Sequence, residues 1–223
     1  GDVVEVGRNV RTVSAGSRVT SEINLTCGKC HFCEAGIPTH CLNRKAIGID
    51  VDGAFAEYIV VPSKNIHLLP KSISYEEGVF VEPLAAAIQT IRMSPLEPRS
   101  TVAVIGDGRL AQLVVQVVKA RVPGSKLFML GKHDSKLDTT RRLITLDAIV
   151  NVTREDPVKT IMTATGGLGV DMAIEATGNP KALNLALSLV RHRGTIAVKS
   201  THGQPVPIDA TQVAVRELTL QGS

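Results

Sequence analysis

The sequence predicts an α/β protein in two parts, an irregular β region followed by a doubly wound parallel sheet. Up to about Pro70, short apolar runs alternate with Gly, Pro and Asn, which is typical of antiparallel strands and turns. After Arg99, strand-like runs alternate with helix-like stretches, as in parallel strands joined by helical crossovers. We therefore expect one domain over residues 1–80 and a second over residues 81–223.

The first part contains short strand-like runs separated by turn residues. These runs cover residues 2–6, 18–23, 54–62 and 65–70. Ser74 and Glu77 then have the spacing of a capping box, in which a serine oxygen and a glutamate each bind a free N–H group at a helix start. A helix-like apolar stretch follows to Met93, and residues 94–100 are typical of a linker turn.

The second part repeats strand and helix in alternation. Predicted strands cover residues 101–106, 126–131, 147–152, 170–176 and 194–200. The clearest helix spans residues 109–121, and a polar helix-like stretch follows the second strand. Two more helices are predicted at Asp156-Pro157 and Asn179-Pro180, where a capping side chain precedes proline at the first helical position.

Composition narrows the class of protein. The chain has 223 residues, 43% of them hydrophobic, with a formal net charge of +4. Aromatic residues make up only 3% and Trp is missing, so stacking platforms for single-stranded nucleic acid are not expected. Because no apolar run approaches the roughly 18 residues of a membrane span, we expect no membrane partner and a cytoplasmic protein. Gly1 lies inside a strand-like pattern, which indicates an internal piece of a longer protein.

All four cysteines lie within one short segment. Cys27, Cys30, Cys33 and Cys41 have the spacing C-x2-C-x2-C-x7-C. Four thiolates can close a tetrahedron around a zinc ion, and tight Cys-x-x-Cys turns let several ligands come from one loop. Such a site has no open position for a substrate, so we predict a structural zinc ion that contributes folding energy.

Other uses of these cysteines are less compatible with the sequence. Two disulfides would suit a secreted chain, but these thiols are too closely spaced to join distant loops. An iron–sulfur cluster of the bacterial ferredoxin kind expects its last cysteine after three residues and before proline, whereas Cys41 comes after seven and precedes Leu42. His31 and His40 could replace a cysteine ligand, but with four cysteines present we expect exposed loop residues.

A glycine-rich turn follows the first strand of the second part. Gly106, Gly108 and Ala111 form the pattern G-x-G-x-x-A between an apolar strand and an amphipathic helix. The first glycine allows the tight turn, the second lets a pyrophosphate approach the backbone, and the helix N-terminus favours the anion. The alternative is a plain strand-to-helix turn. The cofactor contacts predicted here are Gly106, Asp107, Gly108, Arg109 and Leu110.

The end of the second predicted strand favours NADP(H) over NAD(H). NAD-specific sites place an acidic residue there, about 20 positions past the glycines, to bind the adenosine ribose. This sequence has Gly131 at that position, followed by Lys132 and His133. Glycine would leave room for a 2′-phosphate and lysine would offer it a positive charge. As alternatives, Lys132 is only a solvated surface residue, or Asp134 reaches the ribose from a loop of different shape.

Glu82 is the single charge in the apolar run GVFVEPLAAA. An unpaired carboxylate would be costly to bury, so Glu82 is expected to cap a helix begun by Pro83, to be paired, or to bind a metal. The residues alone leave capping and metal binding open.

Together these motifs resemble the zinc-containing medium-chain dehydrogenase/reductase family, the alcohol and polyol dehydrogenases. The matching runs are VVEVG, the four-cysteine segment, GAFAEYIVVP, VEPLAAA, VIGDGRLAQ, VDMAIEATGNP and ELTLQGS. The resemblance implies part of a GroES-like catalytic domain with a structural zinc lobe, followed by a Rossmann dinucleotide-binding domain. It also implies hydride transfer between NAD(P) and an alcohol, polyol or sugar, with homo-oligomers formed through the Rossmann domain.

In the polyol branch of that family, the Glu of the EPL motif lies at the catalytic zinc, which implies Glu82 as catalytic residue and metal ligand. The family's other catalytic ligands precede the VVEVG strand, so this chain by itself is expected to be inactive. A non-catalytic NADPH sensor or scaffold derived from a dehydrogenase is the alternative. A zinc-ribbon nucleic-acid binder is disfavoured because Lys29 and Lys45 make no basic stripe.

Overall fold

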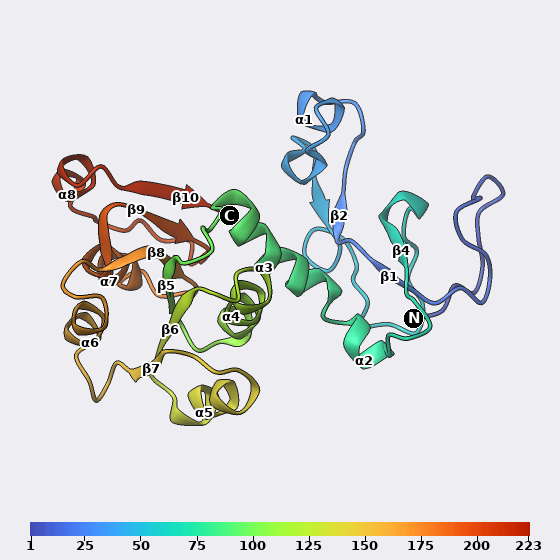
Figure 1. Ribbon diagram of the computed structural model, residues 1–223. Helices are drawn as coiled ribbons and strands as arrows, with labels where there is room; N and C mark the ends of the chain where they lie inside the picture. Colours follow the sequence, from blue (N-terminus) through green and yellow to red (C-terminus); the bar gives the residue numbers. More distant parts are fainter. The chain divides into compact units, whose positions relative to one another are not determined.

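The computed structural model describes residues 1–223, the whole chain. The chain divides into two compact units, Gly1–Glu82 and Pro83–Ser223, drawn in blue to teal and in green to red in Figure 1. The predicted domain boundary, between residues 80 and 81, lies two residues before this division. None of the helices is both long and apolar enough to span a membrane.

The second unit is built on one six-stranded sheet in which every pairing is parallel. Its strands are β5 (Thr101–Ile105), β6 (Lys126–Gly131), β7 (Ala148–Asn151), β8 (Val170–Glu175), β9 (Val190–Val198) and β10 (Thr219–Gly222). The spatial order β7-β6-β5-β8-β9-β10 runs outward from β5 in both directions. This is the order of a classic dinucleotide-binding Rossmann sheet, so the predicted fold class is confirmed.

Helices cover both faces of this sheet (Figure 1). They are α3 (Val81–Met93), α4 (Arg109–Arg121), α5 (Asp134–Leu143), α6 (Pro157–Ala164), α7 (Ala182–Leu189) and α8 (Ala210–Val215). Val102 and Val104 of β5 belong to a buried cluster with residues of α3, α4 and α5. Ala103 and Ile105 belong to a second cluster with residues of α6 and α7. Side chains that alternate along one strand therefore supply two cores, because successive Cβ atoms point to opposite faces.

Most helix starts in this unit follow the sequence signals. α4 has the predicted bounds, and the side chain of Asp156 accepts hydrogen bonds from the N–H groups of Val158 and Lys159, which caps α6 as predicted. The prediction for α7 is wrong by two residues. Asn179 binds the N–H group of Lys181 at 3.0 Å in a turn, so the helix begins only at Ala182.

The first unit contains only short elements. They are β1 (Val19–Ser21), β2 (Asn24–Leu25), α1 (His31–Glu34), the 3-10 helix η1 (Pro38–His40), β3 (Lys45–Ala46), the 3-10 helix η2 (Ser63–Asn65), β4 (Ile66–Leu68) and α2 (Tyr75–Gly78). β1 pairs with β4, and β2 with β3, both antiparallel as expected.

Two predicted strands do not form in this unit. Residues 54–62 are in no strand and are mostly exposed, and residues 2–6 make one isolated bridge, between Asp2 and Arg18. Alternating apolar residues favour a strand, but a strand also needs a neighbour for its N–H and C=O groups. The alternation was therefore insufficient evidence for a strand in either segment.

The predicted helix-like stretch from Ser74 to Met93 forms two helices, α2 and α3. The capping box is confirmed, since Ser74 Oγ accepts from the Glu77 N–H group and the Glu77 carboxylate accepts from the Ser74 N–H group. α3 begins at Val81, so Pro83 is its third residue and not its first. Glu82 therefore lies in the first turn with an exposed side chain, and the expected burial cost does not arise.

Candidate functional site

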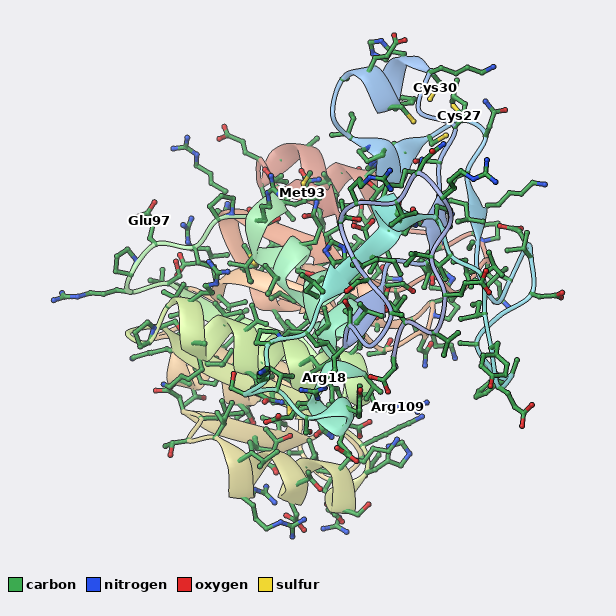
Figure 2. The ribbon with its side chains drawn as sticks, turned by 90° about the vertical axis from the view of Figure 1, so that its right-hand side faces the viewer. Arg18, Cys27, Cys30, Met93, Glu97 and Arg109 are labelled. Atoms are coloured by element: carbon green, nitrogen blue, oxygen red, sulfur yellow. The ribbon has the colours of Figure 1, made fainter.

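The four cysteines converge on one point in the first unit. Their Sγ atoms all lie within 4.8 Å of one another. The Sγ–Sγ distance is 3.6 Å between Cys30 and Cys33 and again between Cys27 and Cys41. Figure 2 shows Cys27 and Cys30 in this lobe. The four thiols are free, so no disulfide forms.

Tight local turns bring these ligands together. Gly28 and Gly36 adopt left-handed backbone angles, with φ of +74° and +76°, which glycine tolerates and other residues rarely do. Cys30 caps the short helix α1, which carries Cys33, and Cys41 directly follows η1. The segment therefore presents all four sulfur atoms to one centre with little regular structure.

The geometry fits a zinc ion. A tetrahedron with Zn–S bonds of about 2.3 Å has S–S edges of about 3.8 Å, close to the two shorter sulfur distances. His31 and His40 are exposed and lie outside the cluster; the His40 ring is hydrogen-bonded to Thr39 Oγ1 at 3.2 Å. The cluster is compatible with the predicted structural zinc, held by cysteine alone.

The thiols differ in acidity. A hydrogen bond from the Lys29 N–H group lowers the pKa of Cys27 to about 6, and one from the Cys33 N–H group lowers the pKa of Cys30. Burial raises the pKa of Cys33 to about 11, with further contributions from the neighbouring sulfurs. Four thiolates cannot all ionise at close range without a cation, which is the condition that a bound metal provides.

A second candidate site lies at the carboxyl edge of the parallel sheet, where the glycine-rich turn joins β5 to α4. Gly106 has φ of +132°, and a Cβ there would lie 2.6 Å from the carbonyl oxygen of Ala176. Gly108 precedes α4 without a side-chain cap, and a Cβ there would meet open space. Gly106 is thus required for packing, whereas Gly108 leaves the helix N-terminus open to a ligand.

The other residues of the turn differ in their exposure to solvent. Arg109 is exposed (Figure 2). Ala111 is fully buried and Leu110 packs against the core beside it. Asp107 was expected to contact a cofactor, but only 7% of its surface is exposed.

The space beside Gly131 is not open. A Cβ at Gly131 would lie 2.6 Å from the Asp107 Cβ and 2.7 Å from a methyl carbon of Leu137. The predicted room for a 2′-phosphate at this point is therefore filled by the Asp107 side chain, which reaches the end of β6 from the neighbouring turn. Two residues in the sequence could have indicated this arrangement: Asp107, between the two glycines of the turn, and Gly131, which ends β6.

The Asp107 carboxylate binds the two residues that follow Gly131. Its Oδ2 accepts the N–H groups of Lys132 and His133, each at 2.8 Å, and lies 2.9 Å from Nδ1 of His133. Burial opposes ionisation of Asp107, but these hydrogen bonds outweigh it and lower the pKa of the carboxyl. Lys132 and His133 themselves are exposed.

Glu175 is a further residue at this edge that the sequence did not indicate. It ends β8 and is only 2% exposed. Its Oε1 accepts the Thr177 N–H and hydroxyl groups at 2.8 and 2.6 Å, and the Ser200 hydroxyl at 2.9 Å. The carboxylate thereby fastens the loop after β8 to the loop after β9, next to the glycine-rich turn.

Two family descriptions together match most of the chain. "Alcohol dehydrogenase GroES-like domain" matches residues 1–71 and "Zinc-binding dehydrogenase" matches residues 110–223. The chain belongs to the zinc-binding dehydrogenase family. This confirms the resemblance drawn from the sequence motifs, including a GroES-like region that precedes a dinucleotide-binding domain.

Named relatives agree with this family. The chain is 34% identical over 223 residues to L-threonine 3-dehydrogenase of Caldanaerobacter subterraneus subsp. tengcongensis, covering all of this chain and 63% of the relative. The chain thus spans less than two thirds of the length of this curated relative.

Solved structures of proteins described as dehydrogenases share the fold. A protein of Sinorhizobium meliloti 1021, described as a zinc-binding dehydrogenase bound to NADP, superposes with a TM-score of 0.91 at 33% identity, over 100% of this chain and 66% of that one. A protein of E. coli CFT073, described as a short chain alcohol dehydrogenase (rspB) complexed with NADH, gives a TM-score of 0.92 at 25% identity, over 100% of this chain and 65% of that one. The two neighbours therefore differ in the cofactor bound.

Proposed function

We propose that this chain forms the structural zinc lobe and the cofactor-binding platform of a zinc-dependent oxidoreductase. The enzyme transfers a hydride between NADP(H) and the hydroxyl-bearing carbon of an alcohol, polyol or sugar. The observation that carries the proposal is the open helix N-terminus behind Gly108, at the carboxyl edge of a Rossmann sheet. The dehydrogenase relatives support an enzyme over the non-catalytic sensor.

The chain's own residues bind and orient the cofactor. The free N–H groups in the first turn of α4 hold the pyrophosphate, and the absence of a Cβ at Gly108 lets it approach the backbone. The ordered loops after β8 and β9, joined by Glu175, border the same edge of the sheet. The bound nicotinamide supplies the hydride chemistry.

The preference for NADP(H) rests on the residues after β6. Lys132 and His133 are exposed there, and no strand-end carboxylate is offered to a ribose. The Sinorhizobium relative, bound to NADP, is in accord with this assignment. NAD(H) remains the competing cofactor, because the E. coli relative is complexed with NADH.

Glu82 is proposed as a ligand of a catalytic zinc in the full-length enzyme. The basis is the family motif VEPLAAA and the exposed carboxylate in the first turn of α3. A carboxylate oxygen suits such a site, since it can bind zinc at about 2.0–2.2 Å. We also predict that the full-length enzyme is a homo-oligomer. Its substrate carries a hydroxyl group, and the L-threonine 3-dehydrogenase relative adds hydroxyl-bearing amino acids to the candidate substrates.

Cofactor titration of this chain tests the proposal. The fluorescence of NADPH and of NADH is followed as wild-type protein or the Gly108→Ala variant is added to each cofactor. Since a Cβ at Gly108 meets no protein atom within 4 Å, the variant is expected to fold normally and to bind NADPH at least about tenfold more weakly. Gln116→Ala, on the exposed side of α4, is the matched control and should bind as wild type does.

Two results would contradict the proposal. One is a wild-type chain that binds neither NADPH nor NADH. The other is a Gly108→Ala variant with unchanged affinity for both.

A further inference from the structure

The carboxylate at the end of β6 does not come from the last residue of that strand, where NAD-specific sites place an acidic residue. It comes from another segment. A side chain at Gly131 and the Asp107 carboxylate exclude each other, since a Cβ at Gly131 would lie 2.9 Å from Asp107 Oδ2. Asp107 comes from the glycine-rich turn after β5, and β5 pairs directly with β6. The glycine that ends β6 is therefore matched to the aspartate between the two glycines of the turn.

Most acceptor positions of the Asp107 carboxylate are already occupied within the protein. Oδ2 is bound by two N–H groups and by Nδ1 of His133, at 2.8, 2.8 and 2.9 Å. Oδ1 lies 3.2 Å from the same Nδ1 and 3.9 Å from Nζ of Lys136. With its side chain 9% exposed, Asp107 differs from the acidic residue of an NAD site, which offers its oxygens to two ribose hydroxyls.

The second carboxylate of this edge is also partnered. Asp134 Oδ1 accepts the side-chain amide of Asn151 at 2.7 Å, and Oδ2 pairs with Arg154 at 2.5 Å. Both Asp134 oxygens are therefore engaged within the protein, and a ribose would have to compete with Asn151 and Arg154 for them.

Several basic groups remain accessible beside these carboxylates, although the Asp134 side chain is itself 43% exposed. The side chains of His133, Lys136 and Arg154 are 46%, 48% and 69% exposed, and Lys132 is exposed as well. The buried Asp107 carboxylate is thus surrounded by basic side chains that are partly exposed to solvent. Such a surface suits an anionic group more than a pair of hydroxyls.

We propose that Asp107 is a positioning residue that holds the His133 imidazole for a 2′-phosphorylated adenosine. This inference rests on the proposed function, because it concerns the adenosine end of the same cofactor site. A carboxylate only accepts hydrogen bonds, so the proton on Nδ1 of His133 faces Asp107. Nε2 is then the ring nitrogen left for the ligand, and it donates to a phosphate when the ring is protonated. Lys132 adds a second positive charge beside it.

Binding of two small probes by calorimetry tests this inference. Adenosine 2′,5′-bisphosphate carries the 2′-phosphate, and adenosine 5′-diphosphate does not. Wild type should bind the 2′-phosphorylated probe more tightly, and His133→Ala should lose about tenfold of that affinity with little change for the diphosphate. Asp107→Asn should lose a similar factor, since its amide no longer orders the ring.

A double-variant cycle separates positioning from a general structural role. If Asp107 acts through His133, the double variant Asp107→Asn/His133→Ala loses no more affinity for the 2′-phosphorylated probe than either single variant. Additive losses, or equal losses for both probes, would overturn the inference. Asp138→Asn on α5, an exposed carboxylate paired with Arg141 at 2.6 Å, is the control and should change neither affinity.

Nitrogen-15 spectra of the histidine rings give a readout that does not depend on a folded Asp107 variant. In wild type the His133 ring, assigned by its loss in His133→Ala, should carry its proton on Nδ1; a proton on Nε2 alone overturns the inference. Wild type that binds the two probes equally, or the diphosphate more tightly, overturns this inference alone. Wild type that binds neither probe overturns the proposed function with it.

Discussion

The two units of this chain reach an ordered structure by different means. In the second unit, both faces of a parallel sheet are covered by apolar clusters whose members are almost all inaccessible to solvent. In the first unit, only Cys41 and Ala46 are buried hydrophobic residues, and the strands are two or three residues long. Burial of apolar area stabilises the second unit, whereas the first has little of it.

The difference shows what the cysteine cluster contributes. A region with so small a core cannot offset the conformational entropy of its loops by hydrophobic burial alone. Zinc bound by four thiolates supplies free energy to the folded state only, since the unfolded chain lacks the preformed site. We therefore expect the first unit to depend on a metal and the second to depend on packing.

The largest effect should follow from Cys30→Ser. Wild type is expected to hold about one zinc equivalent, and the variant none, because an incomplete tetrahedron binds zinc far more weakly. Metal analysis should show the loss of zinc. Native-state hydrogen exchange should show that the backbone amides of the first unit lose protection while those of the strands β5 to β10 keep it.

Lys29→Ala is the matched control for this variant, because it keeps the N–H group that binds Cys27 and removes only an exposed side chain. Unchanged zinc content and melting temperature in Cys30→Ser would rule out the metal site.

An intermediate effect is expected from Leu127→Ala in β6. Leu127 is fully buried in the cluster that includes α4, so the substitution leaves a cavity and should lower the free energy of unfolding of the second unit by about 2–5 kcal/mol. Urea unfolding followed by far-UV circular dichroism measures the loss, and zinc content should not change.

Leu143→Ala, at an exposed position of α5, should cost less than about 0.5 kcal/mol. A comparable loss in the two variants would mean that the second unit does not depend on packing as described.

The smallest effect should come from Asp171→Asn at the amino edge of the sheet. Asp171 accepts the N–H and hydroxyl groups of Thr101 at 2.6 and 2.8 Å and pairs with Nε of Arg191 at 2.6 Å. Burial opposes ionisation, but these partners together lower the pKa of the carboxyl. The variant should lose about 1–3 kcal/mol of unfolding free energy at pH 7.

The pH dependence of this loss follows from the direction of the shift. A carboxyl with a lowered folded pKa stabilises the fold above its unfolded pKa of about 3.9, and the contribution disappears as the pH falls through the folded value. The stability difference between wild type and Asp171→Asn should therefore begin to fall below about pH 4 and disappear below the folded pKa. Asp138→Asn, in an exposed ion pair, should show almost no difference at any pH; equal profiles for the two variants would contradict the assignment.

The sequence by itself determined the features that depend on local chemistry. The spacing of the four cysteines, the bounds of α4, the cap at Asp156 and the capping box at Ser74 all follow from residues that are close together in the sequence. The alternation of strands and helices was also sufficient for the doubly wound class, because parallel strands require crossovers.

Only the tertiary structure decided features that depend on a distant partner. Residues 54–62 have the pattern of a strand but find no neighbour to pair with, and Glu82 lies in an apolar run yet its side chain is exposed in the first turn of α3. Likewise, Gly131 and Asp107 are 24 positions apart, and only the pairing of β5 with β6 places the carboxylate in the space that the glycine leaves. Sequence patterns report the preference of each segment, whereas pairing and burial depend on which other segment occupies the adjacent space.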